Sequence, residues 1–253
     1  MRYALLGSVL ALAALAVANT SLAQTSAQSG KVPVATAKPD FSGIWLYAGE
    51  NKGGGGYNRK YTVEDAPLQP SALETYKANR MGLKDPRAKG IDTRDPGNFC
   101  FPAGLTRVML GYPNPFEIIQ LSNKVVIFDE ISSMMRQIFT DGRGHPEGWP
   151  FGWLGHSIGK WDGDVLVVDT VSLNDRNWLD LAGTPHSDAF HVVERFRRVD
   201  HDTMQIDFTF EDPKAFTKTW GAKRVYRLRP DLELLERVLC EENLQIGKHK
   251  EGY

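Results

Sequence analysis

A chain of 253 residues with a formal net charge of −1 has neither the excess of basic residues nor the basic stripe that nucleic-acid binding requires, which excludes a nucleic-acid partner. The length is sufficient for one large β domain whose hydrophobic core needs no metal ion. After the first residues no apolar run approaches the roughly 20 residues that cross a bilayer, so no membrane span is predicted.

The N-terminal segment predicts export. Arg2 gives a positive start, residues 5–17 are mostly apolar, and Ser21-Leu22-Ala23 is a small-residue cleavage site. This combination is typical of a secretory signal peptide. We therefore expect residues 1–23 to be removed and the mature protein, which begins at Gln24, to be periplasmic or secreted.

The mature chain is expected to form a leader and a single domain. Residues 24–39 are rich in Ser, Ala, Thr, Gln and Pro, which predicts a disordered leader, and residues 40–253 form the predicted domain. The two cysteines, Cys100 and Cys240, most simply pair in an exported protein. A disulfide across so long a loop would contribute about 4–5 kcal/mol in the chain-entropy model. Two free thiols are the alternative.

The first part of the domain contains one predicted strand and one predicted helix. In the strand, residues 40–47, Gly43 allows close backbone approach and Trp45 is large enough to plug one end of a barrel. This Gly-x-Trp pattern resembles the first strand of lipocalins. The glycine-rich segment 52–57 is not followed by the Gly-Lys-Ser/Thr of a phosphate-binding loop, so no nucleotide cofactor is expected. Residues 70–80 have helical spacing.

The rest of the domain has the residue pattern of a β protein. Short β-branched and aromatic runs are separated by Gly, Pro, Asp and Asn, which predicts about nine strands. A meander this long removes its edges by closing into a barrel or by splitting into a sandwich. We predict an all-β fold, an antiparallel meander that closes as a lipocalin-like β-barrel with one short helix, long loops and a central ligand cavity. The predicted strands are 116–121, 124–131, 136–140, 155–161, 164–171, 190–199, 203–212, 218–228 and 232–239.

One predicted hairpin organises the candidate site. Asp162-Gly163 lies between two strand-like runs and tolerates the positive φ of a tight turn, so the chain is expected to reverse there. The following run, 165–168, is apolar throughout and indicates a strand covered on both faces. It leads into the polar loop 172–189, which gathers donors, acceptors and titratable groups near one strand end.

A Gly-x-Ser-x-Gly motif precedes the hairpin. Residues 155–159 match the nucleophile motif of α/β-hydrolases, but they lead into a hairpin and not into a helix, so a catalytic Ser157 is the weaker interpretation. Alternation along a strand places His156 and Ile158 on one face, and Ser157 and Gly159 on the other. His156, which can transfer protons near neutral pH, is the better candidate.

The candidate catalytic residues are His156, Asp175, Arg176 and His186. The two histidines can exchange protons with a substrate, and Asp175 can orient or assist one of them. Arg176 can hold an anionic or developing oxyanion group. An ion pair that only closes the loop is the alternative role for Asp175 and Arg176.

Candidate substrate-binding residues lie near these groups. Trp153 and Trp178 offer flat surfaces for stacking, and His145 precedes an aromatic cluster that predicts a cavity rim. Glu194 and Arg195 point to opposite faces of one predicted strand. Whichever of them faces inward must be paired or bound to substrate, because an unpaired buried charge is costly.

A zinc site is the alternative role for the histidines. His145, His156 and His186 could supply three nitrogen ligands, but they lack the close spacing of known zinc motifs. We therefore predict no metal and no other cofactor.

A series of short motifs runs through nearly all of the mature chain. The motifs are Phe41-Ser42-Gly43-Ile44-Trp45, Pro115-Phe116-Glu117-Ile118, Thr140-Asp141-Gly142-Arg143, residues 155–170, Asn174-Asp175-Arg176, Pro185-His186-Ser187 and Glu194-Arg195-Phe196. Together they resemble a family of uncharacterised exported bacterial β-rich proteins that occur in many copies in soil bacteria. The resemblance implies no particular reaction, although many copies in one bacterium would suit the scavenging of varied nutrients.

These observations predict an exported β-barrel enzyme that uses His/Asp acid–base chemistry, as a lyase, isomerase or hydrolase, on a small aromatic or carbohydrate-derived substrate. The alternative is a non-catalytic, lipocalin-like carrier of a small hydrophobic ligand, whose pocket the same aromatic residues would line. A structural protein of the cell envelope is a third interpretation. The sequence specifies neither the substrate nor the oligomeric state.

Overall fold

The computed structural model describes residues 38–49, 66–83, 95–112 and 114–236. The predicted signal peptide, most of the predicted leader and the glycine-rich segment lie outside these residues. Cys240 also lies outside them, so its disulfide with Cys100 stays a prediction. All described residues belong to one compact unit of the chain, and no helix among them is long and apolar enough to cross a membrane.

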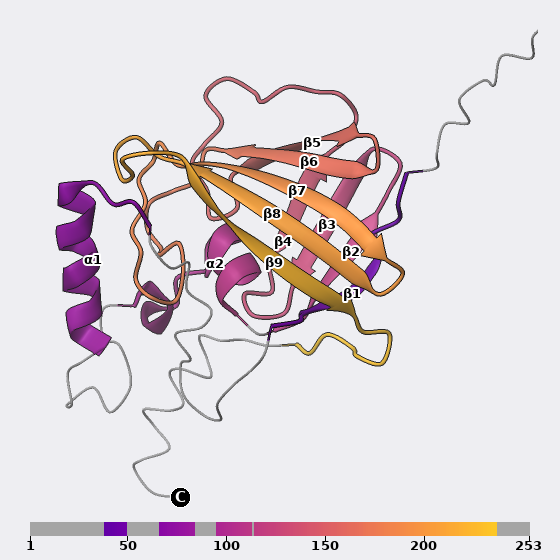
Figure 1. The fold of residues 1–253 in the computed structure, drawn as a ribbon, viewed down its shortest axis with the longest axis horizontal. Helices are drawn as coiled ribbons and strands as arrows, with labels where there is room; N and C mark the ends of the chain where they lie inside the picture. Colours follow the sequence, from indigo (N-terminus) through magenta and orange to yellow (C-terminus); the bar gives the residue numbers. More distant parts are fainter. Residues whose placement is uncertain (1–37, 50–65, 84–94, 113, 237–253) are drawn as a thin grey trace, which may run out of the picture. The chain divides into compact units, whose positions relative to one another are not determined.

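Nine strands form a closed barrel in which each strand lies beside its neighbours in sequence and β1 closes the ring against β9 (Figure 1). This confirms the predicted all-β barrel. Closure satisfies the backbone groups that an open sheet would leave at its edges. The strands are β1 Gly43–Tyr47, β2 Phe116–Gln120, β3 Lys124–Asp129, β4 Met135–Phe139, β5 His156–Asp162, β6 Val165–Val171, β7 His191–Asp200, β8 Thr203–Glu211 and β9 Trp220–Leu228.

The pairing of β4 with β5 departs from the predicted antiparallel meander. These two strands run parallel, and only two residue pairs join them, Ile138 with Ser157 and Phe139 with Ile158. The parallel direction is possible because the long connection 140–155 carries the chain back along the barrel before β5 begins. Since β5 begins at His156, the first residues of β4 have no partner on β5, which leaves a gap in the pairing at this point of the wall.

Two α-helices and one short 3-10 helix accompany the barrel: α1 Pro70–Leu83, η3 Pro96–Phe99 and α2 Gly104–Gly111. Helix α1 is the predicted helix 70–80, extended by three residues. Helix α2 was not predicted, because its eight residues are too few to show a clear helical period. Its Leu105, Met109 and Leu110 join the hydrophobic core, and the buried hydroxyl of Tyr226 on β9 donates to the carbonyl oxygen of Met109.

Two local predictions need correction. The hairpin between β5 and β6 has Asp162 paired with Val165, so the turn residues are Gly163 and Asp164, one position later than predicted. Gly163 has a φ of +62°, which suits a two-residue turn with glycine in its first position. The described part of the predicted last strand, residues 232–236, is not a strand.

Buried apolar side chains point into the barrel and form the hydrophobic core, and the predicted central ligand cavity stays a prediction. Trp45 is fully buried, and its indole nitrogen donates to the Phe41 carbonyl at 2.8 Å. Each large apolar side chain buried in this way stabilises the fold by roughly 1.5–3 kcal/mol. Inward-facing members of the core cluster include Ile118, Ile127, Ile138, Leu166, Val168, Val192, Phe196, Met204, Ile206, Phe208 and Phe210.

Candidate active site

A buried polar network interrupts this core. Arg136 on β4 forms an ion pair with Glu194 on β7, and both are almost completely buried. Arg136 also donates to Ser157 Oγ at 3.2 Å and to Thr170 Oγ1 at 3.0 Å. Glu194 therefore does face inward, paired with an arginine. Ser157 is a buried strand residue, which argues against a role as a hydrolase nucleophile.

His156 lies on the outer face of the barrel wall, opposite in direction to Ser157, as the alternation of the strand predicted. The His156 ring stacks on Phe139, with centroids 5.6 Å apart, and contacts the Trp149 ring at 4.7 Å. Only 3% of the residue is exposed, because the connection 140–155 covers it. Of the aromatic residues that follow His145 in the sequence, Trp149 thus contacts His156.

A series of hydrogen bonds leads away from the His156 ring. Nδ1 of His156 lies 2.8 Å from Nδ1 of His145, and Nε2 of His145 lies 3.0 Å from Oδ1 of Asp169. Because a carboxylate only accepts, Asp169 fixes a proton on Nε2 of His145. The Nδ1 atom of a neutral His145 is then an acceptor, so Nδ1 of His156 carries the proton between the two rings.

The hydrogen bonds continue from Asp169 along the outer face of the barrel to exposed residues. Asp169 also accepts from Nε2 of His191 at 3.0 Å, and Nδ1 of His191 contacts Glu211 at 3.1 Å. The hydrogen bonds of His191 with these two carboxylates raise its pKa, and the bond with Asp169 has the larger effect. The same contact with His191 lowers the pKa of Asp169. Asp169 is thus held as an anion between two imidazole rings.

The second nitrogen of His156 is available for chemistry. No hydrogen bond joins Nε2 of His156 to another described residue. The described side-chain atoms that are both buried and unpaired are Arg107 Nε and Trp220 Nε1, so Nε2 of His156 is not buried. It therefore reaches open space. Burial of the ring, followed by the repulsion that would arise if His145 and His156 were both protonated and by the positive charge of Arg143, lowers the pKa of His156. At neutral pH the Nε2 lone pair is unprotonated and can accept a proton.

A cavity of about 160 Å³ adjoins His156 where the pairing of β4 with β5 is interrupted. Arg136 and Ser157 line it together with Phe139, Trp149 and Met135. Met135 and Trp149 are 57% and 42% exposed, so they form an apolar rim. Four of the five N–H groups of Arg136 have acceptors in the network above, and among the described residues no acceptor meets the fifth, on Nη1.

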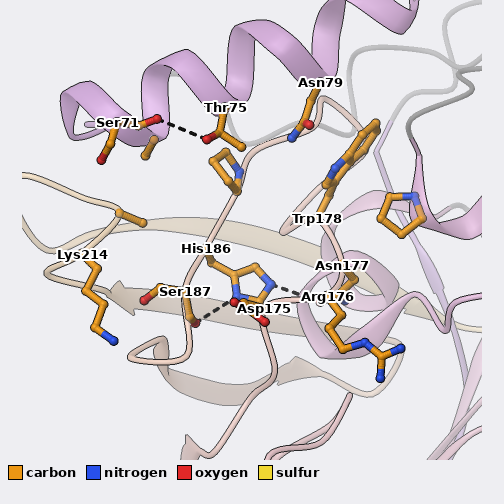
Figure 2. A pocket seen from close by; sticks show the side chains of 14 residues that line it. Ser71, Thr75, Asn79, Asp175, Arg176, Asn177, Trp178, His186, Ser187 and Lys214 are labelled. Carbon is orange, nitrogen blue, oxygen red and sulfur yellow. Dashed lines mark hydrogen bonds between the residues drawn. The ribbon is translucent and has the colours of Figure 1, made fainter.

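The other candidate catalytic residues lie in a different cavity, so the four do not form one cluster. Asp175, Arg176 and His186 line a cavity of about 420 Å³ beside α1 (Figure 2), and Trp178 also lines it. His156 does not line this cavity. The prediction assumed that one strand end gathers all these groups, whereas the loop after β6 turns toward α1 and His156 remains on the wall.

Two further predicted binding residues have other contacts. Trp153 packs against Phe101, with ring centroids 5.4 Å apart, and against the Arg176 guanidinium. Arg195 faces outward and donates to Asp162 at 2.8 Å. In the described part of the chain no three His, Cys, Asp or Glu side chains are arranged to hold a metal ion, and His186 is not joined to the other two histidines of the alternative zinc site.

Sequence reasoning missed Arg136 and Asp169. Arg136 stands in a short predicted strand whose facing could not be assigned. Asp169 is the one charged residue in the run 165–171, a signal that could have marked it. Strand register, which the sequence does not reveal, decides that it meets His145 and His191. Comparison of the sequence with protein-family models and with curated proteins finds no match.

Proposed function

We propose that this protein is an exported β-barrel enzyme in which His156 transfers protons to and from a small substrate. The observation that carries the proposal is Nε2 of His156, which has no hydrogen-bond partner among the described residues and reaches open space beside an aromatic cavity. The opposite nitrogen is hydrogen-bonded through His145 to Asp169. This arrangement suits proton abstraction, and therefore isomerisation or elimination, better than attack by Ser157.

The hydrogen-bond series would strengthen His156 as a base. When His156 accepts a proton on Nε2, its Nδ1–H bond to His145 is strengthened, and the Asp169 carboxylate stabilises the positive charge shared by the two rings. Burial acts in the opposite direction and lowers the pKa of His156, which favours the unprotonated ring at neutral pH. A base whose pKa lies near or below the working pH is efficient, and such proton transfer contributes roughly 100- to 10,000-fold to a rate.

The cavity dimensions favour a compact, planar substrate. A hydrophobic cavity of about 150 Å³ holds one benzene ring, and the cavity beside His156 measures about 160 Å³. Phe139 and Trp149 would stack on the ring. The remaining N–H of Arg136 would bind an oxygen atom of the substrate and stabilise negative charge that develops when a proton leaves.

The non-catalytic carrier receives less support. A lipocalin-like carrier binds its ligand inside the barrel, whereas none of the inward-facing apolar residues named above lines either of the two cavities described here. Export through the N-terminal signal remains part of the proposal, and it rests on the sequence pattern alone.

The test is proton abstraction from 5-nitrobenzisoxazole, a compact aromatic probe. Transfer of its carbon-bound proton to Nε2 of His156 breaks the N–O bond and releases a coloured cyanophenolate. We expect a saturable rate above buffer that falls about 100-fold or more in His156→Ala. The His201→Ala variant is the control, since His201 has a side chain that is 84% exposed and contacts Asp202. Equal rates for wild type and His156→Ala contradict the proposal.

A further inference from the structure

The larger cavity, of about 420 Å³, lies between α1 and the loop that contains Asp175 and His186 (Figure 2). Two contacts fix α1 beside this loop and the β8–β9 connection. The backbone nitrogen of Gln69 donates to the Ala215 carbonyl at 2.8 Å, and Asn79 Nδ2 donates to the Gly183 carbonyl at 2.8 Å. The cavity walls are therefore held together by hydrogen bonds.

Hydroxyl and amide groups line this cavity from both sides. Helix α1 presents Ser71, Thr75 and Asn79 at intervals of four residues, which places them on one face. Asn177 and Ser187 lie on the loop opposite. Such groups can each donate or accept, and they match ligand hydroxyl groups, which do both.

The cavity is lined by two cations, Arg176 and Lys214, which each have a partner outside the lining, and by one carboxylate, Asp175. The ammonium group of Lys214 is paired with Asp188, and the Arg176 guanidinium lies over the Phe101 ring at 4.8 Å. The Asp175 carboxylate, by contrast, is exposed and forms no hydrogen bond with any described residue. An available carboxylate accepts strongly from hydroxyl groups and repels anions.

His186 lines this cavity with an uncharged ring. Its Nε2 lies 3.1 Å from Oδ1 of Asn177, whose amide nitrogen donates to the Ala103 carbonyl, and its Nδ1 lies 3.4 Å from the Ser187 carbonyl. A neutral ring has one N–H, which donates from Nε2 to Asn177, so Nδ1 is left as an acceptor that the Ser187 carbonyl oxygen cannot pair with. Burial lowers the pKa of His186, so the ring carries no charge at neutral pH.

We propose that this cavity binds a neutral, polyhydroxylated molecule the size of a mono- or disaccharide. Its volume lies within the range of small-molecule sites. Asp175, Ser71 and Thr75 would accept from or donate to the ligand hydroxyls. The apolar surfaces of Ala72 and Pro185 would cover its C–H face. This site is separate from His156 and does not depend on catalysis there.

Titration calorimetry of the full chain tests the inference with D-glucose, D-galactose, maltose and myo-inositol as neutral probes and D-glucuronate as the anionic probe. We expect saturable binding of at least one neutral probe, with glucuronate at least tenfold weaker. Asp175→Ala and Thr75→Val should each weaken binding about tenfold. Both side chains are exposed, so these variants should fold, which circular dichroism verifies.

Two controls separate this site from the acid–base site. Glu74→Gln changes an exposed residue of α1 that pairs with Lys77 and does not line the cavity, so it should leave the affinity unchanged. His156→Ala should also retain binding even when proton transfer is lost. The inference is overturned if no neutral probe binds, if glucuronate binds more tightly than the neutral probes, or if Asp175→Ala retains full affinity.

Discussion

Nδ1 of His145 lies 2.8 Å from Nδ1 of His156, so one proton serves both atoms. Asp169 assigns that proton to His156, because it accepts from the other nitrogen of His145. His156 therefore donates to His145, and His145 donates to Asp169. As a result, a change at Asp169, on the outer face of β6, should be felt at Nε2 of His156.

Removing the Asp169 charge should weaken proton transfer by His156. In Asp169→Asn the two histidine rings lose the anion that stabilises their shared positive charge, and we expect the rate with 5-nitrobenzisoxazole to fall about 10- to 100-fold. The raised pKa of His191 should fall toward its ordinary value at the same time, since its bond with Asp169 is the leading cause of the rise. NMR titration of His191 measures this second effect. An unchanged rate would show that Asp169 does not support proton transfer by His156.

Acidification should destabilise the fold through His156. The pKa of His156 is lowered in the folded protein from its ordinary value of 6.5, so below that pH the unfolded chain binds more protons than the folded chain. The free energy of unfolding therefore falls as pH drops below about 6.5 and on through the folded pKa. Urea unfolding at a series of pH values should show a smaller fall in His156→Gln. A larger fall in the variant would contradict the assigned direction of the shift.

Breaking the buried ion pair should cost far more stability than breaking an exposed one. Glu194→Ala leaves the Arg136 charge buried without its partner, and we expect the free energy of unfolding to drop by about 3–5 kcal/mol. Replacing both residues with apolar ones, as in Arg136→Met with Glu194→Leu, should restore part of this loss. Chemical denaturation measures each change.

Arg195 provides the matched control for this ion pair. It is the residue after Glu194 and faces the opposite side of β7, where its pair with Asp162 is exposed. Arg195→Ala should change the free energy of unfolding by less than about 1 kcal/mol. Equal effects of Glu194→Ala and Arg195→Ala would show that burial does not determine how much the loss of an ion pair lowers the free energy of unfolding.

The predicted disulfide can be tested by counting thiols. If Cys100 and Cys240 are paired, the denatured, non-reduced protein should react with no thiol reagent, and reduction should lower the free energy of unfolding by about 4 kcal/mol. Cys100→Ser and Cys240→Ser should have equal effects, since either removes the same bridge. Two reactive thiols before reduction would show that the cysteines are free.

The barrel fold and the opposite facing of neighbouring residues in a strand could be predicted because they follow from local pattern. Alternation in β5 assigns His156 and Ser157 to opposite faces, and short strands joined by turns predict a closed meander. These features depend on residues close together in the chain. They do not depend on which strand lies beside which.

The grouping of the side chains could not be predicted because it depends on register and on long connections. His145 reaches His156 only because the connection 140–155 folds back over a parallel pair of strands. Asp169 joins them from β6, and His191 from β7. The loop with Asp175 is instead directed toward α1, a contact between segments about 100 residues apart that no short-range pattern encodes.

The most direct measurement of the central claim is the protonation of the His156 ring, read from its imidazole nitrogen shifts by NMR at neutral pH. We predict a neutral ring with the proton on Nδ1 and an unprotonated Nε2, and a pKa below 6.5 that moves in Asp169→Asn. A proton on Nε2 at neutral pH, or a charged His156 ring, would contradict the role of His156 as the base.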